Sequence, residues 1–364
     1  MGCKLGAPSL FVCSFPNSPI GILMTTPIEY DFASMIQPPP PTAIFEDPDY
    51  NIWCGSMVEG EDGKYHLFYS RWLKSLGHLA WVTHSEVAHA VADHPLGPYK
   101  HIDVVLPARG EAFWDGSCTH NPTVARFGKK YYLYYTGNKG DGVPSQSLNW
   151  THRNNQRIGV AVADHPAGPW KRFDRPVIEA TPGFFDALCC ANPTVAQRPD
   201  GSILMVYKAV GNKKELPFGG PVVHVVATSG SPTGPFQKYP KPVFLVEGVN
   251  FAAEDPFIWQ GKDRYWAVVK DNDGRFTGRG YSLALFESPD GFAWELAKHR
   301  FVTTPEIPLA DGTRKQLTAL ERPQVWLDND GEPAVLFCAG SEVPNRSPSF
   351  NVQFPLRRYD ADHW

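Results

Sequence analysis

The chain has 364 residues, of which 42% are hydrophobic, 13% aromatic and 20% charged. This composition excludes a disordered chain or a coiled coil and is typical of a folded protein with many short strands and turns. The net charge is −4, so bulk electrostatics do not favour binding to nucleic acid. No stretch is long and apolar enough to suggest a membrane span.

The N-terminal segment precedes the first expected strand. It contains two apolar patches, Leu10–Val12 and Ile20–Met24, which are separated by prolines. This pattern is a poor match to a secretory signal, so the localisation of the protein stays open. A proline run at 38–41 leads into the folded body. We therefore expect residues 1–42 to form an extension.

Five segments then repeat one pattern: a short polar motif, an apolar strand, a turn and a second strand that is rich in apolar and aromatic residues. They read WCGSMVEGEDGKYHLFYSR, HNPTVARFGKKYYLYYTG, ANPTVAQRPDGSILMVYK, EDPFIWQGKDRYWAVVK and ERPQVWLDNDGEPAVLFCA. Aligned on Met57, Pro122, Pro193, Pro256 and Pro323, they recur every 63 to 71 residues. In the first three repeats, a third strand is followed by a Pro-x-Gly-Pro turn and a short fourth strand.

Four short strands in each of five repeats predict an all-β, single-domain, five-bladed β-propeller. A β-sandwich is disfavoured because its strands would recur every 8–12 residues or so. We expect the propeller to span residues 43–345, with blades starting near residues 53, 115, 186, 250 and 318. The remaining tail, 346–364, is a candidate for closing the ring.

The innermost strand of each blade lines the central channel, so residues just before the anchor positions should converge at its mouth. These residues are Gly55 and Ser56, His120 and Asn121, Ala191 and Asn192, Glu254 and Asp255, and Glu321 and Arg322. Turn chemistry explains Asn and Asp but not the glutamates, so Glu254 and Glu321 indicate a functional site.

Further candidates flank these positions. Arg71, Lys208 and Lys270 end the second strand of three repeats, where they either bind an anionic sugar or offset the acids. Asp115 and Asp186 stand seven residues before the anchors of two repeats, either as catalytic carboxylates or as residues that close a loop. Trp53, Trp72 and Trp114 could stack on sugars or lie in the core.

The motif AEDPFIW at Ala253–Trp259 and the two Asn-Pro repeats before it resemble the five-bladed propeller glycosidases around glycoside hydrolase family 43 and its neighbouring families. The resemblance covers most of residues 45–340. It implies hydrolysis with inversion by an acid and a base, and it places the acid at Glu254. The expected base falls on Ser56 and the expected tuning aspartate on Asn192, so we expect Asp115 or Asp186 to supply the base.

The leading hypothesis is an exo-acting glycoside hydrolase that cleaves a terminal sugar from an oligosaccharide or polysaccharide. The alternatives are a glycoside phosphorylase and a non-catalytic carbohydrate-binding propeller. No cofactor is required, and the seven cysteines lack the spacing of a zinc site. Whether a calcium or sodium ion occupies the channel stays open. The catalytic candidates are Glu254, Asp115 and Asp186, and the substrate-binding candidates are Trp53, Arg71, His120, Asn121, Asn192, Lys208, Asp255, Lys270, Glu321 and Arg322.

Overall fold

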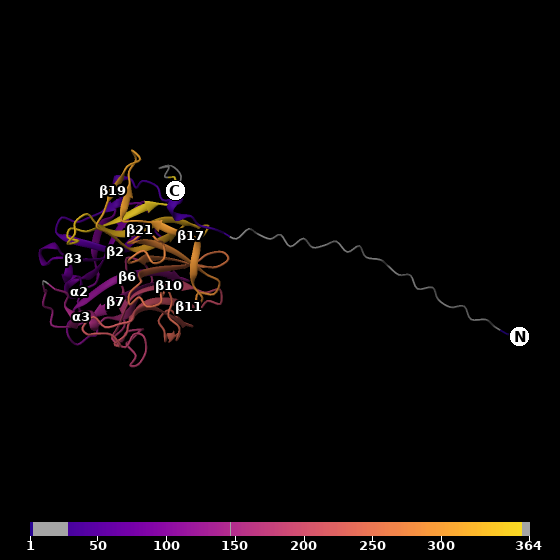
Figure 1. The fold of residues 1–364 in the computed structure, drawn as a ribbon, viewed down its shortest axis with the longest axis horizontal. Helices are drawn as coiled ribbons and strands as arrows, with labels where there is room; N and C mark the ends of the chain where they lie inside the picture. Colours follow the sequence, from indigo (N-terminus) through magenta and orange to yellow (C-terminus); the bar gives the residue numbers. More distant parts are fainter. Residues whose placement is uncertain (3–27, 146, 359–364) are drawn as a thin grey trace.

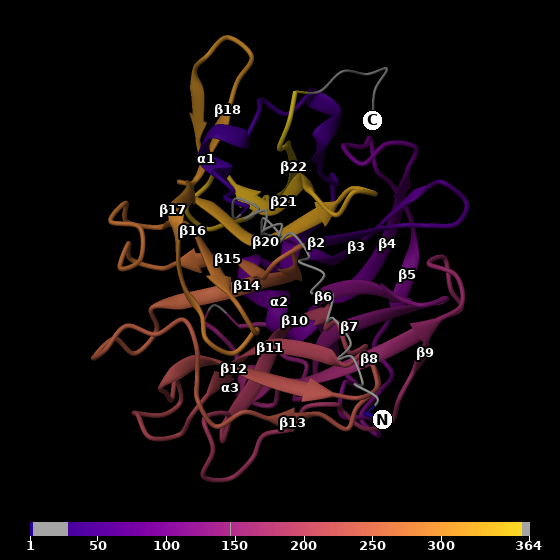
Figure 2. The ribbon, with the colours of Figure 1, turned by 90° about the vertical axis from the view of Figure 1, so that its right-hand side faces the viewer.

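The computed structural model describes residues 1–2, 28–145 and 147–358, and it confirms the predicted five-bladed β-propeller. Five antiparallel four-stranded sheets surround a common axis, and in Figure 2 the sequence colours follow one another around the ring. The innermost strand of each blade packs against the innermost strands of the two neighbouring blades. No helix in the described part of the chain combines the length and hydropathy needed to cross a bilayer.

Each of the first four blades is built from four strands that are consecutive in the sequence, and their labels can be followed in Figure 2. Figure 1 shows the same ribbon from a direction turned by 90°. Blades one and two comprise β2 (Tyr50–Glu59), β3 (Tyr65–Leu73), β4 (Glu86–Ala92), β5 (Lys100–Leu106), β6 (Cys118–Phe127), β7 (Lys130–Asn138), β8 (Arg157–Ala163) and β9 (Lys171–Arg172). Blades three and four comprise β10 (Cys189–Gln197), β11 (Ile203–Val210), β12 (Val222–Ser229), β13 (Gln237–Lys238), β14 (Ala253–Gln260), β15 (Tyr265–Asp271), β16 (Ser282–Ser288) and β17 (Glu295–Thr303).

The fifth blade joins the two ends of the chain. It comprises β20 (Ala319–Leu327), β21 (Pro333–Ser341), β22 (Phe350–Pro355) and, as its outermost strand, β1 (Ile44–Phe45). The blade therefore extends beyond residue 345, because β22 is its third strand and lies in the segment that we expected to be a tail. Closure depends on β1, which pairs antiparallel with β22.

Part of the expected N-terminal extension belongs to the folded body. The short helix α1 (Phe32–Met35) lies against β17, and the buried rings of Tyr30 and Phe32 contact Trp259 of blade four. Residues 3–27, which include the two apolar patches of the N-terminal segment, lie outside the described part of the chain. Residues 28–42 thus pack against blades four and five.

Shorter elements lie in the connections between these strands. They are the 3₁₀ helices η1 (Pro41–Ala43), η2 (Lys74–Leu76) and η3 (His78–Ala80), the α-helices α2 (Trp81–His84) and α3 (Trp150–Asn154), and the hairpin of β18 (Glu306–Pro308) with β19 (Arg314–Gln316). Of these, η3 and α2 supply side chains to the site described below.

The innermost strand of every blade carries a bulge at the same position, where the pairing register shifts. One residue in each bulge has a positive φ: 58° at Cys54, 51° at Asn121, 54° at Asn192, 54° at Asp255 and 55° at Arg322. Asn and Asp tolerate this left-handed conformation, whereas for most other residues it costs about 1–2 kcal/mol. The bulges turn these five side chains toward the axis.

The bulges also correct the alignment of the first repeat. The pairing shift in blade one lies between Trp53 and Ser56, so Gly55, and not Met57, occupies the position of the prolines. In blade one, Cys54 is therefore the residue equivalent to Asn121, whereas Ser56 lies beyond the bulge. Instead, the hydroxyl of Ser56 accepts a hydrogen bond from the backbone N–H of Val124 at 3.0 Å and joins blades one and two.

Candidate active site

A ring of side chains, one from each blade, forms the floor of the candidate site. The Cys54 thiol donates to Asn121 Oδ1 at 2.8 Å, the Asn121 amide donates to Asn192 Oδ1, and Asn192 Nδ2 donates to Asp255 Oδ1 at 2.7 Å. Arg322 donates to the same oxygen of Asp255 at 2.8 Å and also lies beside the Cys54 thiol. We call these five residues the floor ring, and they close the channel across the axis.

A cavity of about 170 Å³ lies above the floor ring. We call it the inner cavity, and it is lined by Trp53, Trp72, His78, Trp81, His120, Asn121, Asn192, Lys208, Glu254, Asp255, Glu321, Arg322 and Arg346. Eight of the ten substrate-binding candidates from the sequence line it, and so does Glu254. Lys270 is not a lining residue, but it donates hydrogen bonds to Glu254 and Glu321. The positions before the repeat anchors therefore converge, apart from the shift in blade one.

Glu254 and Glu321 share one ammonium group. Lys270 Nζ donates to Glu254 Oε2 at 3.0 Å and to Glu321 Oε1 at 2.9 Å, and Lys208 Nζ donates to Glu254 Oε1 at 2.8 Å. Burial alone would raise the pKa of Glu254, but Lys208 and Lys270 outweigh burial and hold this pKa below its ordinary value. Lys270 and Arg346 likewise lower the pKa of Glu321 against the effect of burial. Both carboxylates are therefore ionised at neutral pH.

Asp255 has the opposite tendency. It belongs to the floor ring and is almost fully buried, so burial raises its pKa above the ordinary value, and Arg322 offsets only part of that rise. The nearby negative charge of Glu254 raises the pKa further. The two adjacent acidic residues of β14 thus have pKa values that are shifted in opposite directions, a pattern found at many catalytic sites.

His120 enters the inner cavity from blade two, which is adjacent neither to blade four nor to blade five. Its Nδ1 is 2.7 Å from the hydroxyl of Ser85, which fixes the orientation of the ring, and Trp81 packs on it with 5.0 Å between centroids. Burial, together with the positive charge of Arg322, holds the pKa of His120 well below its ordinary value. A neutral imidazole from blade two therefore lines the same cavity as the two glutamates.

Asp115 does not reach the inner cavity. Its side chain is fully buried at the outer part of blade two, where it accepts hydrogen bonds from Arg109 Nε at 2.9 Å, Tyr135 Oη at 2.8 Å and Arg172 Nη1 at 3.2 Å. These bonds give Asp115 a structural role, because they link the lead-in loop of the blade to its second and fourth strands.

Asp186 has the same role in blade three. It accepts from Tyr207 Oη at 2.8 Å and from the backbone N–H of Thr181 at 3.1 Å, and it also pairs with Lys238. Among the described lining residues of the inner cavity, carboxylates come only from blades four and five. We expected Asp115 or Asp186 to supply the base, but neither residue lines the inner cavity, so this prediction is wrong.

Arg71 also lies away from the inner cavity. Its guanidinium donates to Glu86 Oε1 at 2.9 Å and lies over the ring of Tyr50. This ion pair joins neighbouring strands of blade one, so Arg71 offsets a nearby acid, which was the simpler of the two roles considered for it.

Three lining residues were not expected from the sequence. His78 and Trp81 lie in the connection between β3 and β4, and Arg346 lies in the loop between β21 and β22. Neither connection follows the repeat, so no internal comparison singles these residues out. Among the described residues, no group of three or more His, Cys, Asp or Glu side chains could hold a metal ion.

The sequence matches no protein-family model, and a comparison with curated proteins finds no match. The structure is similar to a family 117 glycoside hydrolase from the marine bacterium Zobellia galactanivorans, with a TM-score of 0.61 and 19% identity over 87% of this chain and 89% of that chain. It is also similar to the native arabinanase of Bacillus subtilis, with a TM-score of 0.58 and 14% identity over 86% and 95% of the two chains. An α-L-arabinofuranosidase from Lactobacillus brevis gives a TM-score of 0.57 and 11% identity over 85% and 92%. The five-bladed propeller of this chain is therefore a fold that it shares with glycoside hydrolases.

Proposed function

We propose that the protein is a glycoside hydrolase that removes a terminal sugar from an oligosaccharide or polysaccharide, with inversion. The observation that carries the proposal is the state of Glu254, a carboxylate that two ammonium groups hold ionised in a closed-ended cavity. An ionised carboxylate accepts protons, so we assign Glu254 the role of the base that activates water. This differs from the proton-donor role that the family resemblance implied.

The opposite wall supports the same proposal. His120 is held by Ser85 and faces the cavity from blade two, so a sugar bound above the floor ring would lie between the imidazole and Glu254. We assign His120 the hydrogen bond to the leaving oxygen. As the glycosidic bond breaks, that oxygen takes the proton of the imidazole, and the proton that Glu254 removes from the attacking water restores the imidazole afterwards. Trp53 and Trp81 add apolar faces of the kind on which sugar rings stack.

The shape of the cavity supports exo-action. The side chains of the floor ring are hydrogen-bonded to one another across the axis, so we expect a glycan to enter with one end instead of passing through the channel. The inner cavity is small compared with the roughly 300–1,000 Å³ typical of ligand pockets, which favours a single sugar unit at its base.

The test is the substitution Glu254→Gln, which keeps the shape of the side chain and removes its charge. We expect turnover to fall by about 10²–10⁴-fold while glycan binding persists, since a positioned acid or base contributes that much. Glu306→Gln on the β18–β19 hairpin is the matched control and should leave turnover unchanged. Proton NMR of the first product gives the anomeric configuration, and assays with and without inorganic phosphate separate hydrolysis from phosphorolysis.

One observation favours a second candidate, a carbohydrate-binding propeller without activity. The lining carboxylates of the inner cavity come from neighbouring blades four and five, so among the described residues no second carboxylate faces Glu254 from across the axis. Saturable glycan binding with no turnover in either the wild type or Glu254→Gln would support this candidate and refute the hydrolase.

A further inference from the structure

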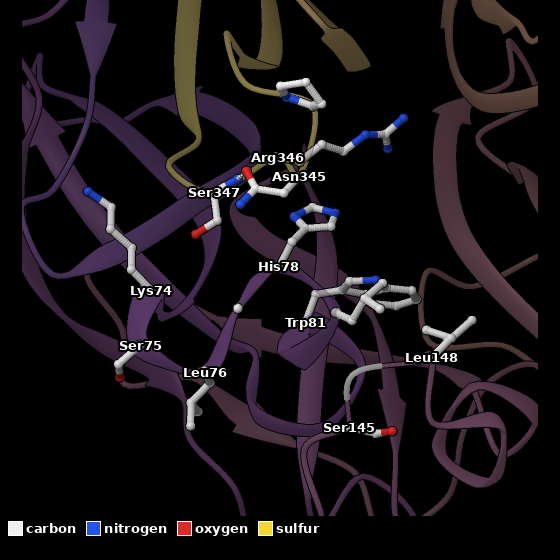
Figure 3. Close-up of a pocket in the computed structure, with 13 residues that line it drawn as sticks. Lys74, Ser75, Leu76, His78, Trp81, Ser145, Leu148, Asn345, Arg346 and Ser347 are labelled. Carbon is white, nitrogen blue, oxygen red and sulfur yellow. Dashed lines mark hydrogen bonds between the residues drawn. The ribbon is translucent and has the colours of Figure 1, made fainter.

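Beside the inner cavity lies a larger space of about 840 Å³, which we call the outer cavity. The two cavities share the lining residues His78, Trp81 and Arg346, so these residues stand where the cavities meet. Figure 3 shows His78 between the loop that carries Arg346 and the side chain of Trp81. A ligand whose terminal sugar fills the inner cavity would therefore place its next sugar beside these three residues.

The walls of this path are positively charged, although the whole chain carries a net charge of −4. The outer cavity is lined by two cations, Lys74 and Arg346, and its described lining residues include no Asp or Glu. In the inner cavity all three carboxylates have cationic partners. Lys208, Lys270, Arg322 and Arg346 together offset the three carboxylates, and Lys74 adds a further cation at the entrance, so the path as a whole carries an excess of positive charge. A cleft with such walls attracts anions.

Arg346 stands at the junction of the two cavities. Its φ of 57° lies in the left-handed region, which residues other than glycine seldom adopt and which often marks functional positions. Its guanidinium forms an ion pair with Glu321 at 2.8 Å, and its side chain remains 35% exposed. A guanidinium has five N–H donors, so one carboxylate partner leaves donors that can bind a second anion in a bidentate fashion.

We propose that Arg346 binds an anionic substituent, either the carboxylate of a uronate or a sulfate ester, on the sugar that follows the terminal unit. The substrate class is then an acidic glycan. Lys74 adds a second positive charge along the same path. The assignment of sugar positions rests on the proposed function, whereas recognition of the anion can be measured as binding alone.

The test measures binding of three disaccharides by calorimetry: digalacturonate, a sulfated galactobiose and neutral galactobiose. We expect the wild type to bind at least one anionic disaccharide tenfold or more tightly than the neutral one, with the advantage shrinking at high salt. Arg346→Gln should weaken anion binding by about 10- to 100-fold, as expected for charged hydrogen bonds, and Arg346→Lys should restore part of it. Whichever anionic disaccharide binds identifies the substituent.

Arg314→Gln is the matched control, because Arg314 also pairs with a glutamate but lies on the β18–β19 hairpin. Equal binding of neutral and anionic disaccharides, no binding of any, or an equal loss for both types in Arg346→Gln would overturn the inference. Turnover of neutral glycans without discrimination would refute only the inference and leave the hydrolase proposal standing. Selective, Arg346-dependent binding without turnover would refute the hydrolase proposal and leave the inference standing.

Discussion

Lys270 offers the sharpest test of the electrostatics of the site. Its ammonium lies between Glu254 and Glu321 at 3.0 and 2.9 Å, and all three side chains are largely buried. Lys270→Met keeps most of the length of the side chain and removes the charge. The two carboxylates then lose their shared partner, and removing one member of a buried ion pair typically costs about 3–5 kcal/mol of unfolding free energy. We expect a loss of that size at pH 7.5.

The loss should depend on pH, and its sign follows from the pKa shifts. In the wild type the pKa values of Glu254 and Glu321 lie below the ordinary value of 4.5, so their contribution to stability is present above that pH and disappears as the pH falls through the lowered values. Without Lys270 both values rise, and the carboxylates can be neutralised by protonation within the fold. The difference between wild type and Lys270→Met should therefore shrink toward pH 4.

Urea denaturation at pH 7.5 and pH 4.5, followed by tryptophan fluorescence, measures both quantities. Lys298→Met is the control, because Lys298 is 67% exposed and pairs with Glu29 on the surface, and it should leave the unfolding midpoint unchanged. Adding Glu321→Gln to Lys270→Met should recover part of the loss, since one uncompensated charge is removed. A loss that is the same at both pH values, or no larger than that of the control, would refute this account.

The remaining predictions concern buried groups elsewhere. Asp115→Asn and Asp186→Asn should each lower the unfolding free energy by about 3–5 kcal/mol and leave the turnover of the folded protein unchanged, and a selective loss of turnover would show a catalytic role. His224 is buried with no hydrogen-bond partner for either ring nitrogen among the described residues, and burial lowers its pKa to about 3. Its contribution to stability is present above the ordinary pKa of 6.5 and is lost as the pH falls toward 3, so denaturation of His224→Phe should show a weaker decline across that range. Phe45→Ala on β1 removes a buried ring that contacts Tyr69, and thermal unfolding should reveal a loss of about 3–5 kcal/mol if β1 holds the ring closed.

The sequence predicted the blades because the repeat recurs at a nearly constant spacing, and each repeat contains its own strands and turns. It also identified the positions that converge, since the side chains before each anchor share one place in the repeat. The alignment of blade one on Met57 is two residues off because Gly55 stands where the other repeats have proline, so no proline marks the anchor in this repeat. Only the pairing across the bulge reveals the correct register.

What the sequence could not predict depends on contacts between distant segments. Asp115 and Asp186 occupy equivalent places in two repeats, which made both of them catalytic candidates. Their structural partners, Arg172 and Lys238, lie more than 50 residues further along the chain. Arg346 lies in a loop that no other repeat shares. The strand β1 has two residues, too few for any periodicity, and it is defined only by its pairing with β22.

The floor ring has a direction. Each amide passes its hydrogen bond to the next blade, and the series ends at Asp255, which accepts from Asn192 on one side and from Arg322 on the other. The negative charge on blade four therefore determines how the amide of Asn192 is turned and, through it, the amide of Asn121 on blade two. The direction in which the Asn121 amide presents its donor and acceptor to a substrate hydroxyl is thus set by Asp255, two blades away. A substitution at Asp255 would therefore alter recognition at Asn121 without moving a single strand.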